Sequence, residues 1–145
     1  MSFQDPEKLL ADAGWTNDRR VDVERHIAAL EEQNFSVGSA TSELISNIAA
    51  LTIRFSRAGR SDKIRIDPSV AVRAVAKAWV DDYSDRVGTA LLPMGLSNHE
   101  HLLLLVAEDG RWFGGFDDEF GFLGPSVRVM VDTLANDRGF QIGLA

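Results

Sequence analysis

The residues best able to do chemistry lie in one acidic, glycine-rich stretch, GRWFGGFDDEFGFLG, at residues 110–124. Its consecutive carboxylates, Asp117-Asp118-Glu119, suggest a hard-cation site, and its glycines suggest a phosphate loop. A Ca²⁺ or Mg²⁺ site needs about six converging oxygens, whereas three adjacent side chains in a turn mostly point apart. The glycines also lack the spacing of a GxxxxGKS/T or GxGxxG loop. We therefore interpret the stretch as a solvated turn between strands, and we expect neither a metal nor a cofactor.

The histidines do not form a convincing catalytic or metal-binding group. His99 and His101 are two residues apart and would share one face of a strand, but a third ligand is not evident. We interpret both, and His26 on its helix, as structural or solvent-facing. Ser, His and Asp residues occur without a GxSxG nucleophile elbow. The sequence therefore indicates a protein that is not an enzyme, with catalysis by a carboxylate in a cleft as the remaining alternative.

Carboxylates close to aromatic residues form a candidate partner-binding surface. Acidic side chains would steer a basic partner toward the surface, and exposed rings would anchor it. The opposing interpretation is that the charges keep the protein soluble and the rings lie in the core. The candidate residues are Asp81, Asp82, Asp85, Glu108, Asp109, Trp112, Phe116, Asp117, Asp118 and Glu119.

The composition narrows the class of protein. The 145 residues carry a net charge of -7, which suits a basic partner better than a nucleic acid, because nucleic-acid binding rests largely on Lys and Arg. The longest apolar run, residues 102–107, is too short to span a bilayer, and the N-terminus does not resemble a secretory signal. The absence of cysteine excludes disulfides and thiolate zinc sites. We expect a cytoplasmic protein with no membrane partner, in an oligomeric state that the sequence leaves open.

Apolar residues at helical spacing predict helices that would carry part of this surface. One covers residues 21–33, with Asn34 as its C-cap, and another begins near Ser39 or Thr41. A long helix should start at Asp67-Pro68 and end at Gly88, and a final helix should follow Gly124-Pro125. The apolar face of the long helix should consist of Val72, Val75, Trp79, Tyr83 and Val87.

The strand patterns lie in two groups between these helices. Residues 51–56 and 63–67 predict a hairpin, and a later meander is predicted at residues 90–96, 101–108, 111–116 and 120–123. Separate runs of strands and helices indicate an α+β fold. We expect a single domain with a mainly antiparallel sheet and helices packed on one face. Its expected limits are 13–140, after a lead-in at 1–12 and before a tail at 141–145.

Several short motifs occur in an order that resembles a known family. They are AGW at 13–15 with Arg19, LTI at 51–53, Asp67-Pro68, YSDRVGTALLPMG at 83–95, DGR at 109–111 and LGPS at 123–126. With them, from about Ala13 to about Leu134, the chain resembles the third subfamily of the SUKH superfamily, the Smi/Knr-like proteins widespread as bacterial immunity proteins. The family often carries a glycine pair before the first strand, where this chain has Ala49-Ala50. Because alanine favours ordinary backbone conformations, we expect that corner to be built differently.

The resemblance implies a SUKH-like sheet flanked by helices and a non-enzymatic function. Members bind and neutralise a cognate toxin, typically the C-terminal domain of a polymorphic toxin, such as a nuclease. Such a domain would here be basic, to match the acidic chain. Immunity surfaces diverge with their toxins, so the resemblance does not transfer contact residues. A protein-binding adaptor of the same fold with another partner is the first alternative, and the carboxylate-dependent enzyme is the second.

Overall fold

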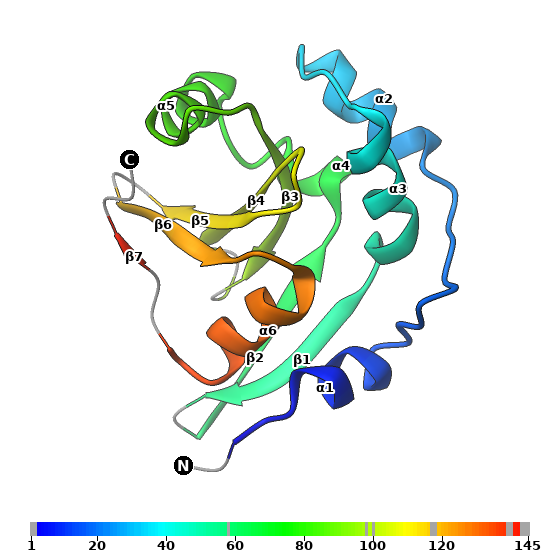
Figure 1. Cartoon of the computed structure of the whole chain (residues 1–145), viewed down its shortest axis with the longest axis vertical. Helices are drawn as coiled ribbons and strands as arrows, with labels where there is room; N and C mark the ends of the chain where they lie inside the picture. The colour runs from blue at the N-terminus through cyan, green and yellow to red at the C-terminus, as the bar shows by residue number, and fades with distance from the viewer. Residues whose placement is uncertain are drawn as a thin grey trace.

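The fold is built on one antiparallel sheet whose strands follow the order of the chain. The structure, a computed structural model, describes residues 3–57, 59–97, 99, 101–116, 119–138 and 141–142. Its sheet has seven strands in the order β1 to β7, each antiparallel to its neighbours (Figure 1). The strands are β1 (Thr52–Arg57), β2 (Arg60–Ile66), β3 (Leu91–Ser97), β4 (Leu102–Ala107), β5 (Trp112–Phe116), β6 (Glu119–Gly124) and β7 (Gln141–Ile142).

Six helices lie around this sheet in the described part of the chain. They are α1 (Pro6–Asp12), α2 (Glu24–Glu32), α3 (Ser39–Ile48), α4 (Pro68–Ala71), α5 (Lys77–Val87) and α6 (Val127–Ala135). None of the helices in the described part of the chain is long and apolar enough to cross a membrane. The expected α+β class with one antiparallel sheet in a single domain is confirmed.

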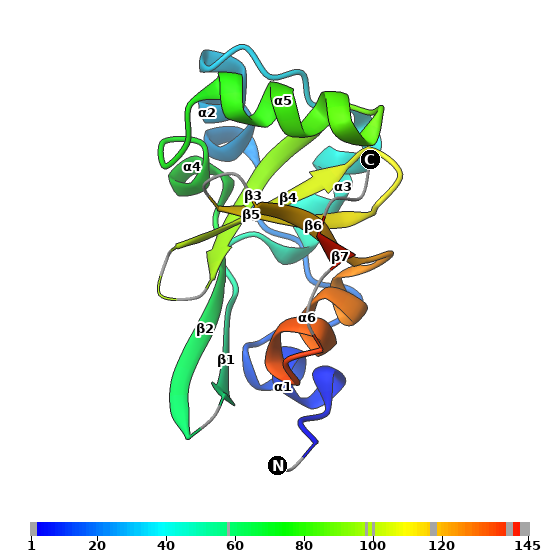
Figure 2. The same ribbon diagram turned by 90° about the vertical axis from the view of Figure 1, so that its left-hand side faces the viewer.

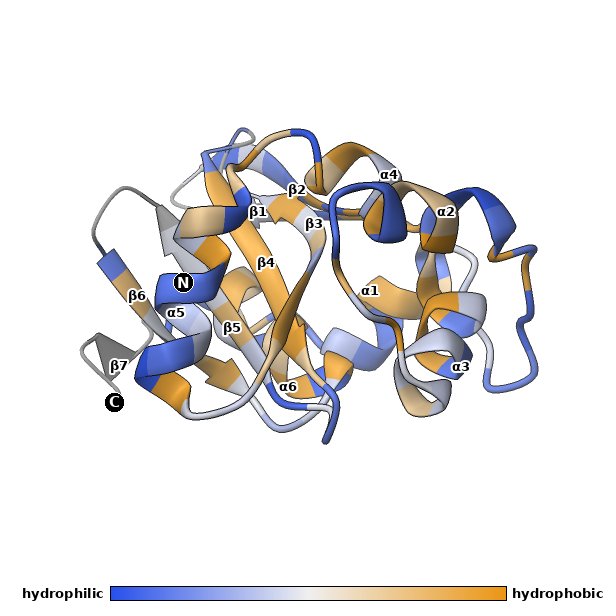
Figure 3. Cartoon of the chain, turned by 90° about the horizontal axis from the view of Figure 1, so that it is seen from above, coloured by the Kyte–Doolittle hydropathy of each residue, from blue (hydrophilic) through white to orange (hydrophobic). Residues whose placement is uncertain are grey.

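The core forms where continuous apolar strands meet the helices. Every residue of β3 and β4 is buried, and β4 runs as a hydrophobic strand through the middle of the molecule (Figure 3). Strand β5 pairs with both β4 and β6, as the predicted meander requires. At the N-terminus, Leu10 of α1 is 1% exposed, and α1 contacts both α6 and β1. The central strands therefore provide a rigid base for the surface elements.

The helices cover both faces of the sheet, which is a broader distribution than the single face expected. Gly114 and Gly115 are successive residues of β5, so they point to opposite faces. A side chain at Gly115 would meet Tyr83 of α5, whereas one at Gly114 would meet Leu102 and Leu123. Figure 2 shows α5 on one side of this part of the sheet and α6 on the other.

The long helix expected between Asp67 and Gly88 is two helices. Short α4 ends at Ala71, and α5 begins after Ala76, whose backbone is extended (φ -75°, ψ 139°). Gly88 ends α5 in the left-handed conformation (φ 84°), as expected. The predicted apolar face is wrong at Trp79, which is 45% exposed. Because the chain leaves helical geometry between α4 and α5, residues at helical spacing across the break do not lie on one common face.

The corner before β1 also differs from the expectation. Ala50 has φ 69°, a left-handed conformation that alanine disfavours. Ala49 before it has an extended backbone, with φ -61° and ψ 148°. The amide of Ala50 donates to the carbonyl of Ile66 at 2.8 Å, which ties the end of α3 to β2. The corner therefore keeps the geometry that a glycine would adopt easily, although its residue is alanine.

Candidate partner-binding surface

Helix α5 presents three of the candidate carboxylates to solvent. Asp81, Asp82 and Asp85 are all exposed, and they lie on the side of α5 opposite its buried residues Val80 and Tyr83. Asp81 pairs with Lys77 at 2.9 Å and Asp82 pairs with Arg86 at 3.1 Å, both one helical turn away. Such exposed pairs contribute little to stability. These carboxylates are therefore available to a partner at small cost.

Trp79 is the exposed aromatic residue of this helix. Its ring lies 6.3 Å from that of Tyr83, which is 2% exposed and stacks on Phe120 at 4.6 Å. The guanidinium of Arg86 lies 5.7 Å from the centre of the Tyr83 ring. We call Trp79, Asp81, Asp82 and Asp85 the α5 face. This face combines an exposed aromatic ring with carboxylates, as expected from the sequence, but the ring is that of Trp79 and not of Trp112.

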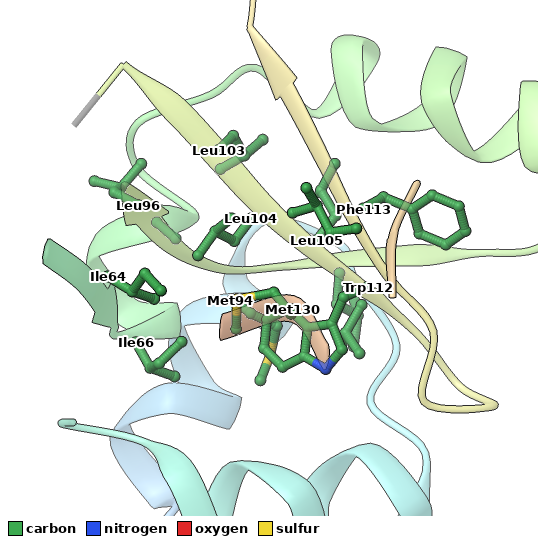
Figure 4. Packing of buried hydrophobic residues seen from close by; sticks show 14 of the residues in the cluster. Ile64, Ile66, Met94, Leu96, Leu103, Leu104, Leu105, Trp112, Phe113 and Met130 are labelled. Atoms are coloured by element: carbon green, nitrogen blue, oxygen red, sulfur yellow. The ribbon is translucent and has the colours of Figure 1, made fainter. Parts of the chain in front are cut away.

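The other tryptophan candidate is part of the core. Trp112 is 0% exposed and packs near Met94 and Met130 (Figure 4). Because Trp112 is enclosed, it cannot contact a partner, and the prediction that it belongs to the binding surface is wrong. Sequence alone could not separate the two tryptophans, because both lie among apolar residues.

Glu108 and Asp109 stabilise local structure at the β4–β5 turn. Glu108 Oε2 accepts a hydrogen bond from the hydroxyl of Thr41 at 2.6 Å, and its carboxylate covers Gly38 at the start of α3. A negative charge there is favourable because a helix N-terminus is electropositive. Asp109 accepts from both the backbone amide and the Nε of Arg111, at 3.2 Å and 2.8 Å.

Glu119 and the backbone of Phe116 lie at the opposite end of β5. Glu119 is exposed and pairs with Phe116 across the strands, next to Phe120, whose ring stacks on α5. Asp117, Asp118 and the Phe116 side chain fall outside the described residues. Because side chains alternate along β6, Glu119 points to the face opposite Phe120, so the structure does not join it to the α5 face. Glu108 and Asp109 belong to the other end of the sheet.

The motif residues near the N-terminus position backbone instead of forming a site. Arg19 donates to the carbonyls of Asn47 and Ala49, at 2.9 Å and 2.7 Å, where α3 ends. Trp15 Nε1 donates to Asn47 Oδ1 at 2.8 Å, and Asn47 Nδ2 in turn donates to the carbonyl of Arg19 at 3.1 Å. Burial lowers the pKa of Arg19. This network holds the segment between α1 and α2 against α3.

One buried ionisable pair lies beneath α2. His26 is 2% exposed, and its Nδ1 lies 3.4 Å from Oδ1 of Asp67, which also accepts from the Ser69 hydroxyl at 2.6 Å. Burial lowers the pKa of His26, while the charge of Asp67 opposes that shift. Because the imidazole is enclosed, the pair joins α2 to the β2–α4 junction and does not contact solvent-borne substrate. This placement agrees with the structural interpretation of His26.

Some surface hollows in the described part of the chain are lined by carboxylates. Three of them, between about 270 and 400 Å³ in volume, are each lined by a single carboxylate, Glu7, Asp85 or Asp62. None of these three therefore holds the carboxylate pair that acid–base chemistry would use. Within the described residues, no group of three or more His, Cys, Asp or Glu side chains could hold a metal ion.

Comparison with known proteins gives one result. The family model described as SUKH-3 immunity protein matches residues 4–137 of this chain. Neither the curated proteins nor the solved structures gave a match.

Proposed function

The chain belongs to the SUKH-3 immunity protein family, and on this premise we propose that it binds a cognate toxin domain and neutralises it by masking its active surface. The family membership carries the function, since the match covers residues 4–137. The proposed partner is the C-terminal domain of a polymorphic toxin. The protein acts by binding and not by catalysis.

We propose the α5 face as the toxin-binding surface. It supports this role because Trp79 is 45% exposed among three exposed carboxylates. A tryptophan that becomes buried on binding is a frequent anchor, and carboxylates around it add charge complementarity. The buried Tyr83–Phe120 stack beneath α5 keeps this surface rigid before binding, which limits the entropy lost on association.

A basic toxin, such as a nuclease, is the partner that fits this surface best. A nuclease recognises phosphates with Lys and Arg, so a carboxylate surface would occupy the same cations and exclude the nucleic acid. The net charge of -7 would also accelerate the encounter at low salt. The chain itself is not proposed to bind nucleic acid or membrane, and its site of action is the cytoplasm.

Co-expression with the toxin tests the function. The C-terminal domain of the toxin encoded beside the gene is expressed with the wild-type chain or with variants, and growth of the host is measured. We expect the wild-type chain to restore growth. The triple variant Asp81→Lys, Asp82→Lys, Asp85→Lys should protect much less, because it replaces attraction by repulsion at the proposed surface.

A matched triple variant on α2 is the control. Glu24→Lys, Glu31→Lys, Glu32→Lys changes three exposed carboxylates and alters the net charge equally. It should retain protection if the α5 face is the binding surface. Absence of rescue by the wild-type chain would refute the immunity function, whereas equal protection by both triple variants would refute only the assignment of α5.

A further inference from the structure

The β1–β2 hairpin is basic in a chain that is otherwise strongly acidic. Residues 52–66 contain five of the 15 Lys and Arg residues but only one of the 22 Asp and Glu residues, Asp62. The hairpin therefore carries a net charge of +4, against -7 for the whole chain. Charges concentrated in this way create a local field opposite to that of the molecule.

Alternation along the strands places cations on one face. Ile53 and Ile64 point into the core and are 0% exposed. The residues that alternate with them along the two strands point to the opposite, outer face. Helices α1 and α6 lie on the inner side of the hairpin (Figure 2). We call this the hairpin outer face. It consists of Thr52, Arg54 and Ser56 of β1 and Ser61, Lys63 and Arg65 of β2.

Two of these cations are directly opposite each other. Arg54 pairs with Lys63 across the strands, in the same phase as Ser56 with Ser61. The amide and carbonyl of Ser56 bond to Gln4 and so point away from β2. Pairs in this phase are the closely spaced ones, with Cα atoms about 4.5 Å apart. Like charges at such a position destabilise a hairpin.

The carboxylates nearby do not relieve this repulsion. Asp62 is opposite Phe55 on the inner face and accepts from the amides of Lys63 and His99, at 2.7 Å and 3.3 Å. Asp67 lies 3.8 Å from Arg65. Among the described residues, neither Arg54 nor Lys63 forms an ion pair. Within the described part of the chain, this exposed pair of cations is therefore uncompensated.

From this arrangement we propose that the hairpin outer face docks an extended acidic segment of a partner protein. Alternate residues of a strand are about 6.7 Å apart, so carboxylates at alternate positions of an extended segment match Lys63 and Arg65 along β2, with Arg54 across from Lys63. Guanidinium groups bind carboxylates with two parallel hydrogen bonds, and the hydroxyls of Ser56 and Ser61 add donors. This surface is distinct from the α5 face, and the proposal does not rest on the toxin.

A protein segment fits this face better than a nucleic acid. The exposed large hydrophobic residues of the described chain are Phe3 and Trp79, and neither lies on the hairpin, so bases would find no ring to stack on. The rest of the molecule is acidic and would repel a polyphosphate that extends beyond the hairpin. A short acidic segment avoids that repulsion.

Fluorescence anisotropy with a labelled peptide of alternating Glu and Ser tests the proposal. We expect the wild-type chain to bind this peptide and not the analogue with Gln in place of Glu. Arg54→Glu with Lys63→Glu should raise the Kd about tenfold or more. The control pair Arg20→Glu with Arg73→Glu changes the net charge equally at exposed positions off the hairpin and should leave the Kd within about twofold.

A single substitution separates binding from folding. Lys63→Glu places a carboxylate opposite Arg54, so it should raise the Tm of the free protein while weakening the peptide complex. The proposal is overturned if the Glu–Ser peptide does not bind, or if both double variants bind it equally. It is also overturned if a single-stranded oligothymidylate binds the same residues more tightly, which would assign the face to nucleic acid.

Discussion

At the scale of single residues, the motifs that carry the family resemblance stabilise backbone. Arg19 binds the last carbonyls of α3, and Trp15 holds Asn47 beside it. Ser126 caps α6 by accepting from the amide of Val129 at 3.2 Å. None of these residues belongs to the α5 face. The scaffold residues are thus separate from the surface proposed to bind the toxin.

Ala50 provides a prediction at this scale. Its left-handed backbone (φ 69°) is costly for alanine and free of strain for glycine. Ala50→Gly should therefore stabilise the protein by about 0.5–1 kcal/mol, after allowance for the greater freedom of glycine in the unfolded chain. Urea denaturation measures the change in the free energy of unfolding.

The neighbouring alanine is the control for this prediction. Ala49 is fully buried, with φ -61°, so Ala49→Gly removes a packed methyl group and relieves no strain. It should lower the free energy of unfolding by about 1 kcal/mol. Loss of stability in Ala50→Gly equal to that in Ala49→Gly would contradict the assigned backbone conformation.

At the scale of elements, α5 depends on one close contact with the sheet. A Cβ at Gly115 would lie 2.8 Å from Cε2 of Tyr83, whose ring is enclosed and stacks on Phe120. The rings of Phe120 and Phe113 are also stacked, at 5.5 Å. The absence of a side chain at Gly115 therefore lets α5 approach the sheet.

Gly115→Ala should disturb this contact. The added methyl group overlaps Tyr83, which has no room to move, so we expect a loss of about 1–3 kcal/mol in the free energy of unfolding. Gly114→Ala is the matched control on the opposite face, where the nearest atoms, at 3.1 and 3.2 Å, are the flexible ends of Leu123 and Leu102. A larger loss for Gly114→Ala than for Gly115→Ala, by thermal denaturation, would contradict the proposed seat of α5.

The strands were easier to predict from sequence than the helix that carries the surface. Alternation in β1 and the apolar run of β4 are local patterns, and the expected strands lie within a few residues of those observed. The break at Ala76 has no comparable local signal, since the residues around it favour helix. Tertiary packing decides such a break, and it also decides that Trp79 is exposed.

At the scale of the whole molecule, charge is separated in space. The carboxylates of α5 lie at one end, and the basic hairpin extends toward the other (Figure 2). The sequence supplies the charges and their clustering along the chain. It does not show which charges lie close together in the fold, because Glu108 contacts Thr41, 67 residues away in the chain. Contacts of that kind depend on the complete fold.

The central claim is most directly tested by the association of the purified chain with the toxin domain encoded beside its gene. Stopped-flow mixing should give an association rate constant that falls as salt is added. Reversal of Asp81, Asp82 and Asp85 to lysine should lower that rate about tenfold or more at low salt, and reversal of Glu24, Glu31 and Glu32 should lower it far less. A complex that fails to form, or that forms at the same rate with the reversed α5 face, would contradict the account.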